Sequence, residues 1–460
     1  MSIVTRRKLP HWLASPISFL MLIAFVTDSL SHQRETLKTD RAVYQEKAPP
    51  ALPRAGGTFS DSTFGTEIMR VTDENTAEEG GTYYSYWPTF NCNNTRLLVK
   101  TGRDGSASVY EFDPTQFRLG SHRRIPKAPA GYLGVEGAIW SGDNPDVLYG
   151  LIGLAIYAYH PSSQSFTRVA DFSNKFPSGD FLWQLSMSRH DEVFAFSRRR
   201  PNDKGGSDYV GYSVYRRSDD SLALDQTIVN NDLDEVQIDK SGRWLVVKGE
   251  TKTTRGFSIR DLRNNGSRTQ LGAGPPDYAP GHSDNDTSFV SGFNNYLNTI
   301  DRRAFANPVP ITSELSLGKD WSQGLHISHL ADNDSWMLVS LYVVNPDKTQ
   351  PGPFHNEIIL VKTDGSEIVV RLLQHHSVYK EYWDTPRANI SRDSRFVAFT
   401  SNWGGRGRRD LFIARLQVPA ASPAKTRLRR VGTGARLLET QENASICPIL
   451  DPVRCGNYLY

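Results

Sequence analysis

A short polar turn followed by an alternating apolar run recurs along most of this chain of 460 residues. The clearest copy is residues 389–402, NISRDSRFVAFTSN, in which a polar turn precedes a strand-like run. Polar turns beside period-two apolar runs are typical of β-strands joined by tight connections. Because one such unit cannot bury its own apolar face, its repetition constrains the fold more strongly than any single motif.

The repeat is visible in seven copies, each with a short strand, a polar turn, a longer strand, a loop and a further strand. The copies span residues 87–113, 138–161, 182–215, 234–262, 279–301, 324–364 and 385–416. Their spacing of roughly 40 to 55 residues matches propeller blades and exceeds the roughly 20 to 34 residues of solenoid repeats. The sequence therefore predicts an all-β, seven-bladed β-propeller over residues 57–417.

The two ends of the predicted ring complement each other. The last unit lacks an outer strand, and an extra alternating strand, residues 66–72, precedes the first unit. If this early strand completes the last blade, the ring closes and its exposed sheet edge disappears. Residues 418–460 would then form an irregular tail outside the ring.

Composition agrees with this fold and limits the possible partners. The 36 glycines, 26 prolines and 11% aromatic residues suit many short strands and turns. A formal net charge of +3, with basic residues in separate clusters, argues against a nucleic-acid-binding surface. The sequence contains no GxSxG elbow, P-loop, GxGxxG or zinc-protease motif, so hydrolase, kinase and dehydrogenase functions lack support.

The N-terminus resembles an export signal. Residues 6–8 are basic and precede an apolar run, residues 12–26, which is shorter than the roughly 20 residues that cross a bilayer. Residues 1–31 are therefore predicted to be a signal peptide, with an uncleaved membrane anchor as the alternative. Residues 32–56 are polar and proline-containing, which predicts a flexible tether. We expect the chain to be periplasmic, on the cell surface or secreted, with no other membrane contact.

Cysteine usage agrees with export. Besides Cys92, the tail contains Cys447 and Cys455 in CPILDPVRC, a stretch that two prolines already bend. This spacing favours a local disulfide in an oxidising compartment, and two unpaired thiols are the alternative.

Five histidines lie where the chain approaches three consecutive blades. His282 lies at the entry of the fifth unit, His326 and His329 lie at the entry of the sixth, and His375 and His376 precede the seventh. The loops that lead into the inner strands of a propeller converge on one face, so these imidazoles can meet. Without nearby thiolates they suit Zn²⁺, Mn²⁺ or a similar ion. Alternatively, each histidine caps a strand or bonds a backbone carbonyl.

Other side chains near these positions suit acid–base or binding roles. His326, His329, His376 and Tyr382 are acid–base candidates, and Arg387 is a cation able to pair with a carboxylate. An inter-blade ion pair is the alternative role for Arg387, and packing is the alternative for Tyr382. The tryptophans at the blade approaches would stack on a sugar ring or plug the channel; they are Trp87, Trp140, Trp183 and Trp383.

The repeat resembles the TolB-like exported propellers, and part of the chain resembles, more weakly, the oligogalacturonate lyase-like branch of that group. The second resemblance rests on GHSD at 281–284, HISH at 326–329, and HHS at 375–377 followed by Pro386, ISRDS and FVAFTSN. The family's His-X-His pair after the HHS segment is replaced here by TPRAN, residues 385–389, and Ser394 replaces a turn glycine.

The lyase resemblance implies a divalent metal, Mn or Zn, that histidines of successive blades hold while a base removes the proton α to a uronate carboxylate. By position it implies that His329, His375 and His376 are metal ligands and that His282 or His326 is the base. It also implies that Arg387 pairs with the substrate carboxylate. The predicted catalytic set is therefore His282, His326, Tyr382 and Arg387.

Two functions of different classes follow. One is a polysaccharide lyase that acts by β-elimination on a uronate-containing oligosaccharide. The other is a non-catalytic propeller that binds a glycan, peptide or protein partner at its channel mouth, in the periplasm or at the cell surface. Convergence of His282, His326, His329 and His376 at one mouth would favour the lyase, and histidines that point to different faces would argue against it.

Overall fold

The computed structural model describes residues 37–102, 104–128, 133, 137–249, 257–271, 280–309, 311–345 and 349–416. The chain divides into two compact units, Met1–Leu37 and Lys38–Tyr460, and the second contains all the strands described below. No helix within the described ranges is long and apolar enough to cross a membrane. The predicted export segment and the tail cysteines Cys447 and Cys455 lie outside the described residues.

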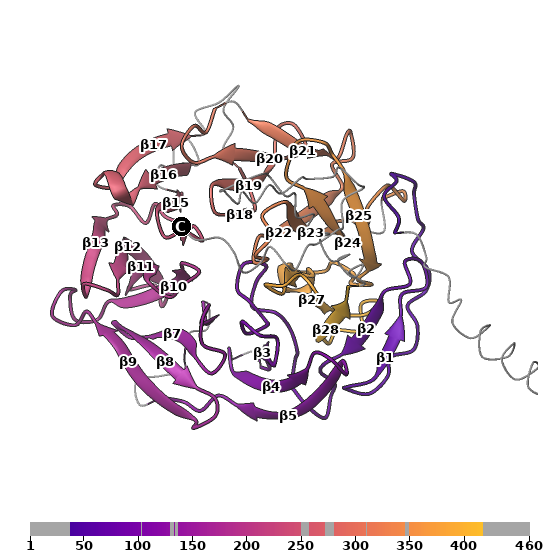
Figure 1. Ribbon diagram of the computed structural model, residues 1–460, viewed down its shortest axis with the longest axis horizontal. Coiled ribbons are helices and arrows are strands. Elements are labelled where there is room, and N and C mark those ends of the chain that lie inside the picture. The colour runs from indigo at the N-terminus through magenta and orange to yellow at the C-terminus, as the bar shows by residue number, and fades with distance from the viewer. Residues whose placement is uncertain are drawn as a thin grey trace, which may run out of the picture. The chain divides into compact units, whose positions relative to one another are not determined.

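Within the second unit, the described strands form seven antiparallel sheets that follow one another around a ring (Figure 1). In the figure β5, β9, β13, β17 and β25, the last strands of their sheets, lie at the rim. Each sheet is one blade, so the predicted seven-bladed β-propeller is confirmed.

The first three blades follow the chain in order. Their strands are β3 (Arg96–Lys100), β4 (Ala107–Asp113) and β5 (Arg118–Arg124); β6 (Ile139–Trp140), β7 (Leu148–Ile152), β8 (Ala155–His160) and β9 (Ser165–Asp171); and β10 (Phe181–Met187), β11 (Val193–Pro201), β12 (Ser207–Arg216) and β13 (Ser221–Thr227).

Blades four to six have the same order. Their strands are β14 (Glu235–Ile238), β15 (Trp244–Lys248), β16 (Phe257–Asp261) and β17 (Ser267–Leu271); β18 (Ser283–Asn285), β19 (Phe289–Asn294), β20 (Thr299–Ala304) and β21 (Thr312–Ser316); and β22 (Gln323–Ser328), β23 (Trp336–Val343), β24 (Glu357–Lys362) and β25 (Val369–Gln374). Two short 3₁₀ helices are η1 (Leu262–Asn264) and η3 (Tyr382–Asp384).

The seventh blade joins the two ends of the ring. It contains β26 (Asn389–Ile390), β27 (Phe396–Ser401) and β28 (Asp410–Arg415), to which β2 (Glu67–Arg70) and β1 (Thr58–Ser60) are added. β2 pairs antiparallel with β28, and the buried Arg70 also donates a hydrogen bond of 2.7 Å to Asp410 of β28. The prediction that the strand near 66–72 completes the last blade is confirmed, and the pairing covers the edge of β28.

The apolar core lies between neighbouring blades. Every residue of β23 is buried because blades five and seven cover its two faces. Successive side chains of a strand point to opposite faces. Accordingly Leu338 belongs to the apolar cluster that contains Phe399 of blade seven, whereas Val339 belongs to the cluster that contains Leu315 of blade five. Burial on both faces explains why middle strands such as WMLVSLYV are continuously apolar.

Residues 38–53, within the stretch predicted as a flexible tether (32–56), contact blades six and seven. Arg371 donates a hydrogen bond of 2.6 Å to the Ala42 carbonyl, and the Trp403 indole donates one of 2.8 Å to the Pro50 carbonyl. Buried donors of the blades thus bind the carbonyl groups of this extended segment.

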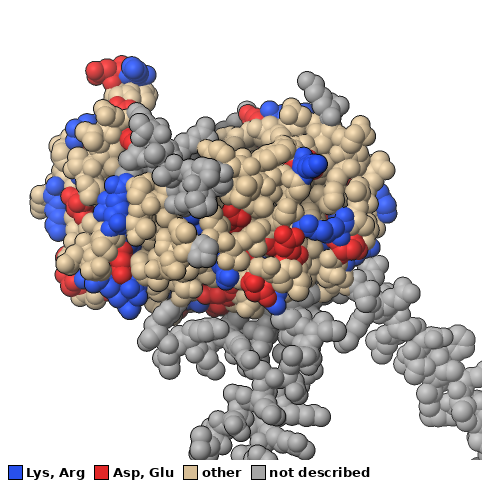
Figure 2. All heavy atoms as spheres, turned by 90° about the horizontal axis from the view of Figure 1, so that it is seen from above, with Lys and Arg blue, Asp and Glu red and all other residues tan. Residues whose placement is uncertain are grey.

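The face drawn in Figure 2 shows acidic and basic side chains intermixed, without a broad field of one sign.

A loop of the first blade enters the central channel. Residues 81–91 reach β3 through isolated bridges at Gly81 and Phe90, and between these bridges Tyr84 bridges to Trp87. We call residues 83–87 the channel loop. The Tyr86 hydroxyl donates to Glu235, and the Trp87 indole donates a hydrogen bond of 3.0 Å to the Leu185 carbonyl. Blades three and four thus hold the loop inside the channel.

Candidate functional site

Two cavities lie at opposite ends of the inner strands, and Tyr86 and Trp87 of the channel loop line both. The wide cavity, of about 1060 Å³, is lined by residues at the starts of the inner strands, such as Ser283 and Gln323. The narrow cavity, of about 120 Å³, is lined by residues nearer their ends, such as Ile238. The channel therefore has two mouths, separated by the channel loop.

Aromatic side chains form much of the wall of the wide cavity. They are Tyr83, Tyr84, Tyr86, Trp87, Phe257, Phe293, Trp321, Tyr342, Tyr382 and Trp383. Trp321 is 55% exposed and Tyr382 is 37% exposed. Rings that remain exposed around a cavity present apolar faces to a ligand, and such faces are frequent in binding sites.

The charged groups of the wide cavity are mainly acidic. Asp232, Asp234 and Glu235 line it, and among the described lining residues Lys248 is the one Lys or Arg. Lys248 donates to Glu235, so its charge is already compensated. The carboxylates of Asp232 and Asp234 remain, and they would repel an anionic ligand.

Two of the predicted histidines meet at the wide cavity. His282 lines it, and its ring stacks on His326 with centroids 4.5 Å apart. His282 Nδ1 lies 2.7 Å from the Leu325 carbonyl oxygen. A carbonyl only accepts, which places the proton on Nδ1 and the lone pair on Nε2. His282 is therefore arranged to accept a proton or a hydrogen bond through Nε2.

His326 lies behind this wall. Its side chain is fully buried, and its Nε2 lies 3.4 Å from the Tyr382 hydroxyl, which shares a short hydrogen bond with the Tyr84 hydroxyl. Burial lowers the pKa of His282 and lowers that of His326 well below its usual value, with neighbouring His282 and Arg387 adding to the second effect. Both imidazoles are therefore neutral near pH 7, and only His282 lines the cavity.

Arg387 is a buried cation. Only 2% of it is exposed, and it donates weak hydrogen bonds to the Tyr382 carbonyl (3.2 Å) and the Thr385 hydroxyl (3.3 Å). Its Nε has no hydrogen bond, and no ion pair joins it to a described carboxylate. Burial lowers the pKa of Arg387 to about 10. Its φ of 39° also lies in the left-handed region. The inter-blade ion pair considered for this residue is not formed with any described residue.

The three histidines predicted as metal ligands lie apart from this cluster. His329 follows His326 by three positions and lies just past the end of the inner strand β22, roughly 10 Å away at a rise of about 3.3 Å per residue, and it lines the narrow cavity. His375 uses both ring nitrogens, with Nε2 2.8 Å from the Leu341 carbonyl and Nδ1 accepting from the Ser377 amide at 2.9 Å. His376 Nδ1 lies 2.7 Å from a carboxylate oxygen of Glu46.

The path of one connector explains this separation. Residues 375–388 run from β25, the outermost strand of blade six, to β26, the innermost strand of blade seven. His375 and His376 come at the outer end of the connector, whereas Tyr382 and Arg387 come at its inner end. Convergence at one mouth is therefore limited to His282 and His326, and His329 and His376 do not join them.

The described residues do not fit the divalent metal that the resemblance implies. They contain no group of three or more His, Cys, Asp or Glu side chains suited to hold an ion. The ring nitrogens of His375 are both occupied, and His282 Nδ1 faces a carbonyl. We therefore derive no chemical step through a metal.

Sequence reasoning missed several residues of the wide cavity. The acidic group of Asp232, Asp234 and Glu235 was not singled out, nor were Trp321 and the tyrosines of the channel loop. Two local signals would have indicated them, the aromatic run YYSYW at 83–87 and the acidic run DLDE at 232–235.

No family model and no curated protein matches the chain. Among solved structures it is similar to an oligogalacturonate lyase in complex with manganese, with a TM-score of 0.58, 13% identity, and coverage of 82% of this chain and 99% of that one. It is also similar to an oligogalacturonate lyase from Vibrio parahaemolyticus, with a TM-score of 0.59, 11% identity, and coverage of 81% and 99%. At this identity the likeness shows the fold. The chain thus has the propeller fold of these lyases, as the sequence resemblance predicted.

Proposed function

We propose that the chain is an exported, non-catalytic propeller that binds a neutral oligosaccharide in the wide cavity, in the periplasm or at the cell surface. The observation that carries this proposal is the combination of an aromatic wall with the carboxylates of Asp232 and Asp234, which no described cation of the wall compensates. Sugar rings present apolar C–H faces that pack on aromatic rings, and their hydroxyl groups donate hydrogen bonds to carboxylates.

Charge favours a neutral ligand over a polyuronate. Each uronate residue would bring a carboxylate toward Asp232 and Asp234, and Lys248 is held by Glu235. The histidine arrangement points the same way, because only His282 and His326 of the four that would mark a lyase converge. The wide cavity therefore supports recognition better than metal-assisted elimination.

A lyase remains the second candidate because of Arg387 and His282. Arg387 does not line the wide cavity, but it donates to the carbonyl of Tyr382, which does. From there a buried cation with no described counter-ion would stabilise the negative charge that develops on a uronate carboxylate when its α proton leaves. His282 Nε2 would take that proton, the C–H electrons would form the double bond, and the departing sugar oxygen would take a proton from the Tyr382 hydroxyl. This route needs no metal, but it requires a uronate to enter the acidic cavity.

Binding and absorbance measured together separate the two candidates. Neutral cello-, xylo- and malto-oligosaccharides and acidic oligogalacturonate are titrated while tryptophan fluorescence and the ultraviolet absorbance of an unsaturated product are recorded. We expect a neutral oligosaccharide to change the fluorescence, Trp321→Ala to weaken that binding by about tenfold, and the absorbance to stay flat. Rising absorbance with oligogalacturonate that His282→Gln abolishes would establish the lyase instead. If no oligosaccharide binds, the proposal is wrong.

A further inference from the structure

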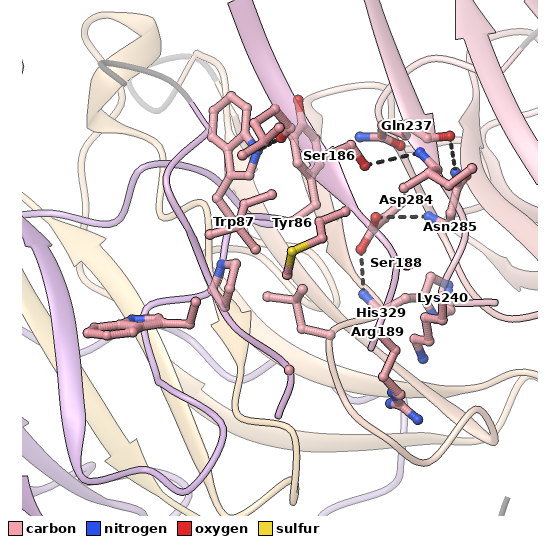
Figure 3. A pocket seen from close by; sticks show the side chains of 18 of the residues that line it. Tyr86, Trp87, Ser186, Ser188, Arg189, Gln237, Lys240, Asp284, Asn285 and His329 are labelled. Carbon is pink, nitrogen blue, oxygen red and sulfur yellow. Dashed lines mark hydrogen bonds between the residues drawn. The ribbon is translucent and has the colours of Figure 1, made fainter. Parts of the chain in front are cut away.

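The narrow cavity is a second concave site that the proposed function does not use (Figure 3). Trp87, Trp140 and Met187 contribute to an apolar part of its wall, and Gln237, Asn285 and His329 contribute polar groups. Its volume of about 120 Å³ is similar to the roughly 150 Å³ of an apolar cavity that admits benzene. The space therefore suits a ligand of about one six-membered ring.

The two amide side chains present acceptors that have no partner. Asn285 Nδ2 donates a hydrogen bond of 3.0 Å to the Gln237 carbonyl, and Gln237 Nε2 donates one of 3.4 Å to Glu235. Because a carbonyl and a carboxylate accept only, these partners fix which end of each amide is nitrogen. The remaining ends, Asn285 Oδ1 and Gln237 Oε1, are buried and accept no hydrogen bond from any described residue.

His329 adds a third buried polar group to the same cavity. It is 1% exposed, and its Nδ1 lies 3.0 Å from a carboxylate oxygen of Asp286, a charge contact without hydrogen-bond geometry. Neither ring nitrogen, Nδ1 or Nε2, makes a hydrogen bond to a described residue. The polar atoms of this wall that have no hydrogen-bond partner among the described residues are thus mainly acceptors. A matching ligand therefore has to supply hydrogen-bond donors.

The cations that line the narrow cavity are already paired. Lys240 donates hydrogen bonds of 2.7 Å to Asp286, to the Ala331 carbonyl and to Asp334. Arg189 and Arg392 both pair with Asp332. Because these cations are compensated inside the protein, and the lining carboxylate of Asp284 already accepts from the Asn285 and His329 amides, the described wall favours a neutral ligand.

We propose that the narrow cavity binds a small neutral ring compound that carries N–H or O–H donors on its edge. The ring packs against Trp87, Trp140 and Met187, and the donors bond to Gln237 Oε1 and Asn285 Oδ1. This site is separate from the wide cavity, so the proposal holds or fails independently of oligosaccharide binding.

The test compares two probes of similar size on the full chain, resorcinol, which has two O–H donors, and m-xylene, in which methyl groups replace both hydroxyl groups. Ligand-observed NMR titration is expected to show resorcinol binding at least about tenfold more tightly, because only resorcinol satisfies the buried acceptors. Gln237→Leu and Asn285→Leu, each checked for folding by thermal unfolding, are expected to remove that preference.

Two control variants locate the bound probe. Gln226→Leu changes a glutamine on the outer strand β13, and Trp321→Ala changes the wide cavity. Both are expected to leave resorcinol binding within about twofold of the original chain. Equal affinity for the two probes would overturn the proposal. So would loss of resorcinol binding in Trp321→Ala, or no binding of either probe, which would mean that the cavity holds water alone.

Discussion

At the scale of single residues, Arg387 is unusual because its charge is buried without a counter-ion among the described residues. Arg371 is buried as deeply, but it pairs with the buried Glu357 and also binds the Ala42 carbonyl. Removing one partner of a buried pair leaves the other uncompensated, whereas removing an unpaired buried charge does not. Replacing each arginine in turn therefore shows whether its buried charge stabilises the fold or is kept for function.

We predict that Arg387→Met leaves the free energy of unfolding unchanged or raises it, while Arg371→Met lowers it by about 3 to 5 kcal/mol. Urea unfolding of both variants measures this difference. Equal losses would show that Arg387 is retained for stability. The lyase function would then lose the main observation that supports it.

The pH dependence of stability depends on a second residue, His375. Burial lowers the pKa of His375 to about 4, whereas an unfolded histidine has a pKa of about 6.5. Between these values the unfolded chain binds a proton that the folded chain does not, so stability falls as the pH falls from about 6.5 to 4. One residue with this shift accounts for about 3 kcal/mol of that loss.

We predict that His375→Gln reduces the loss of stability between pH 6.5 and pH 4 by up to about 3 kcal/mol. His282 and His326 act in the same direction, so a smaller dependence will remain. Urea unfolding at several pH values checks this, with the exposed His122→Gln on β5 as the control. A pH dependence in His375→Gln that equals that of the original chain would contradict the prediction.

At the scale of elements, the blade strands could be predicted because a polar turn and an apolar run occupy consecutive residues. Residues 389–402 and the early strand 66–72 contain that information locally, and both were placed correctly. The sequence of the connector 375–388 does not show which of its ends reaches the channel. That depends on β25 being the outermost strand of its blade and β26 the innermost strand of the next. For this reason Tyr382 meets His326, whereas His376 meets Glu46.

The channel loop is the element on which the separation of the two cavities depends. Trp87 and Trp140 each donate an indole hydrogen bond to a backbone carbonyl, of Leu185 and Thr89 respectively. Replacing Trp87 with Phe leaves the buried Leu185 carbonyl without that donor, which costs about 1 to 3 kcal/mol. The Thr89 carbonyl also accepts from the Leu98 amide at 2.7 Å, so Trp140→Phe costs less. Of the two tryptophans, Trp87 lines both the wide and the narrow cavity, whereas Trp140 lines the narrow cavity and not the wide one.

We therefore predict that Trp87→Phe lowers stability more than Trp140→Phe does, and that only Trp87→Phe weakens oligosaccharide binding in the wide cavity. Thermal unfolding and calorimetric titration with the neutral oligosaccharide identified as a ligand measure the two effects. Equal weakening by Trp140→Phe would mean that the channel loop transmits changes between the cavities and does not isolate them.

At the scale of the whole molecule, the pairing of β2 with β28 joins segments more than three hundred residues apart in the chain, such as Ile68 and Ala414. Ile68 is fully buried among the apolar side chains of blades six and seven. We predict that Ile68→Ala lowers the free energy of unfolding by about 2 to 5 kcal/mol, whereas Ile368→Ala, at a side chain that is 45% exposed, changes it by less than about 0.5 kcal/mol.

Because the blades pack on their neighbours around a closed ring, we expect Ile68→Ala to unfold in one transition when fluorescence and circular dichroism are compared. Separate transitions would show that the ring opens at this junction before the blades unfold.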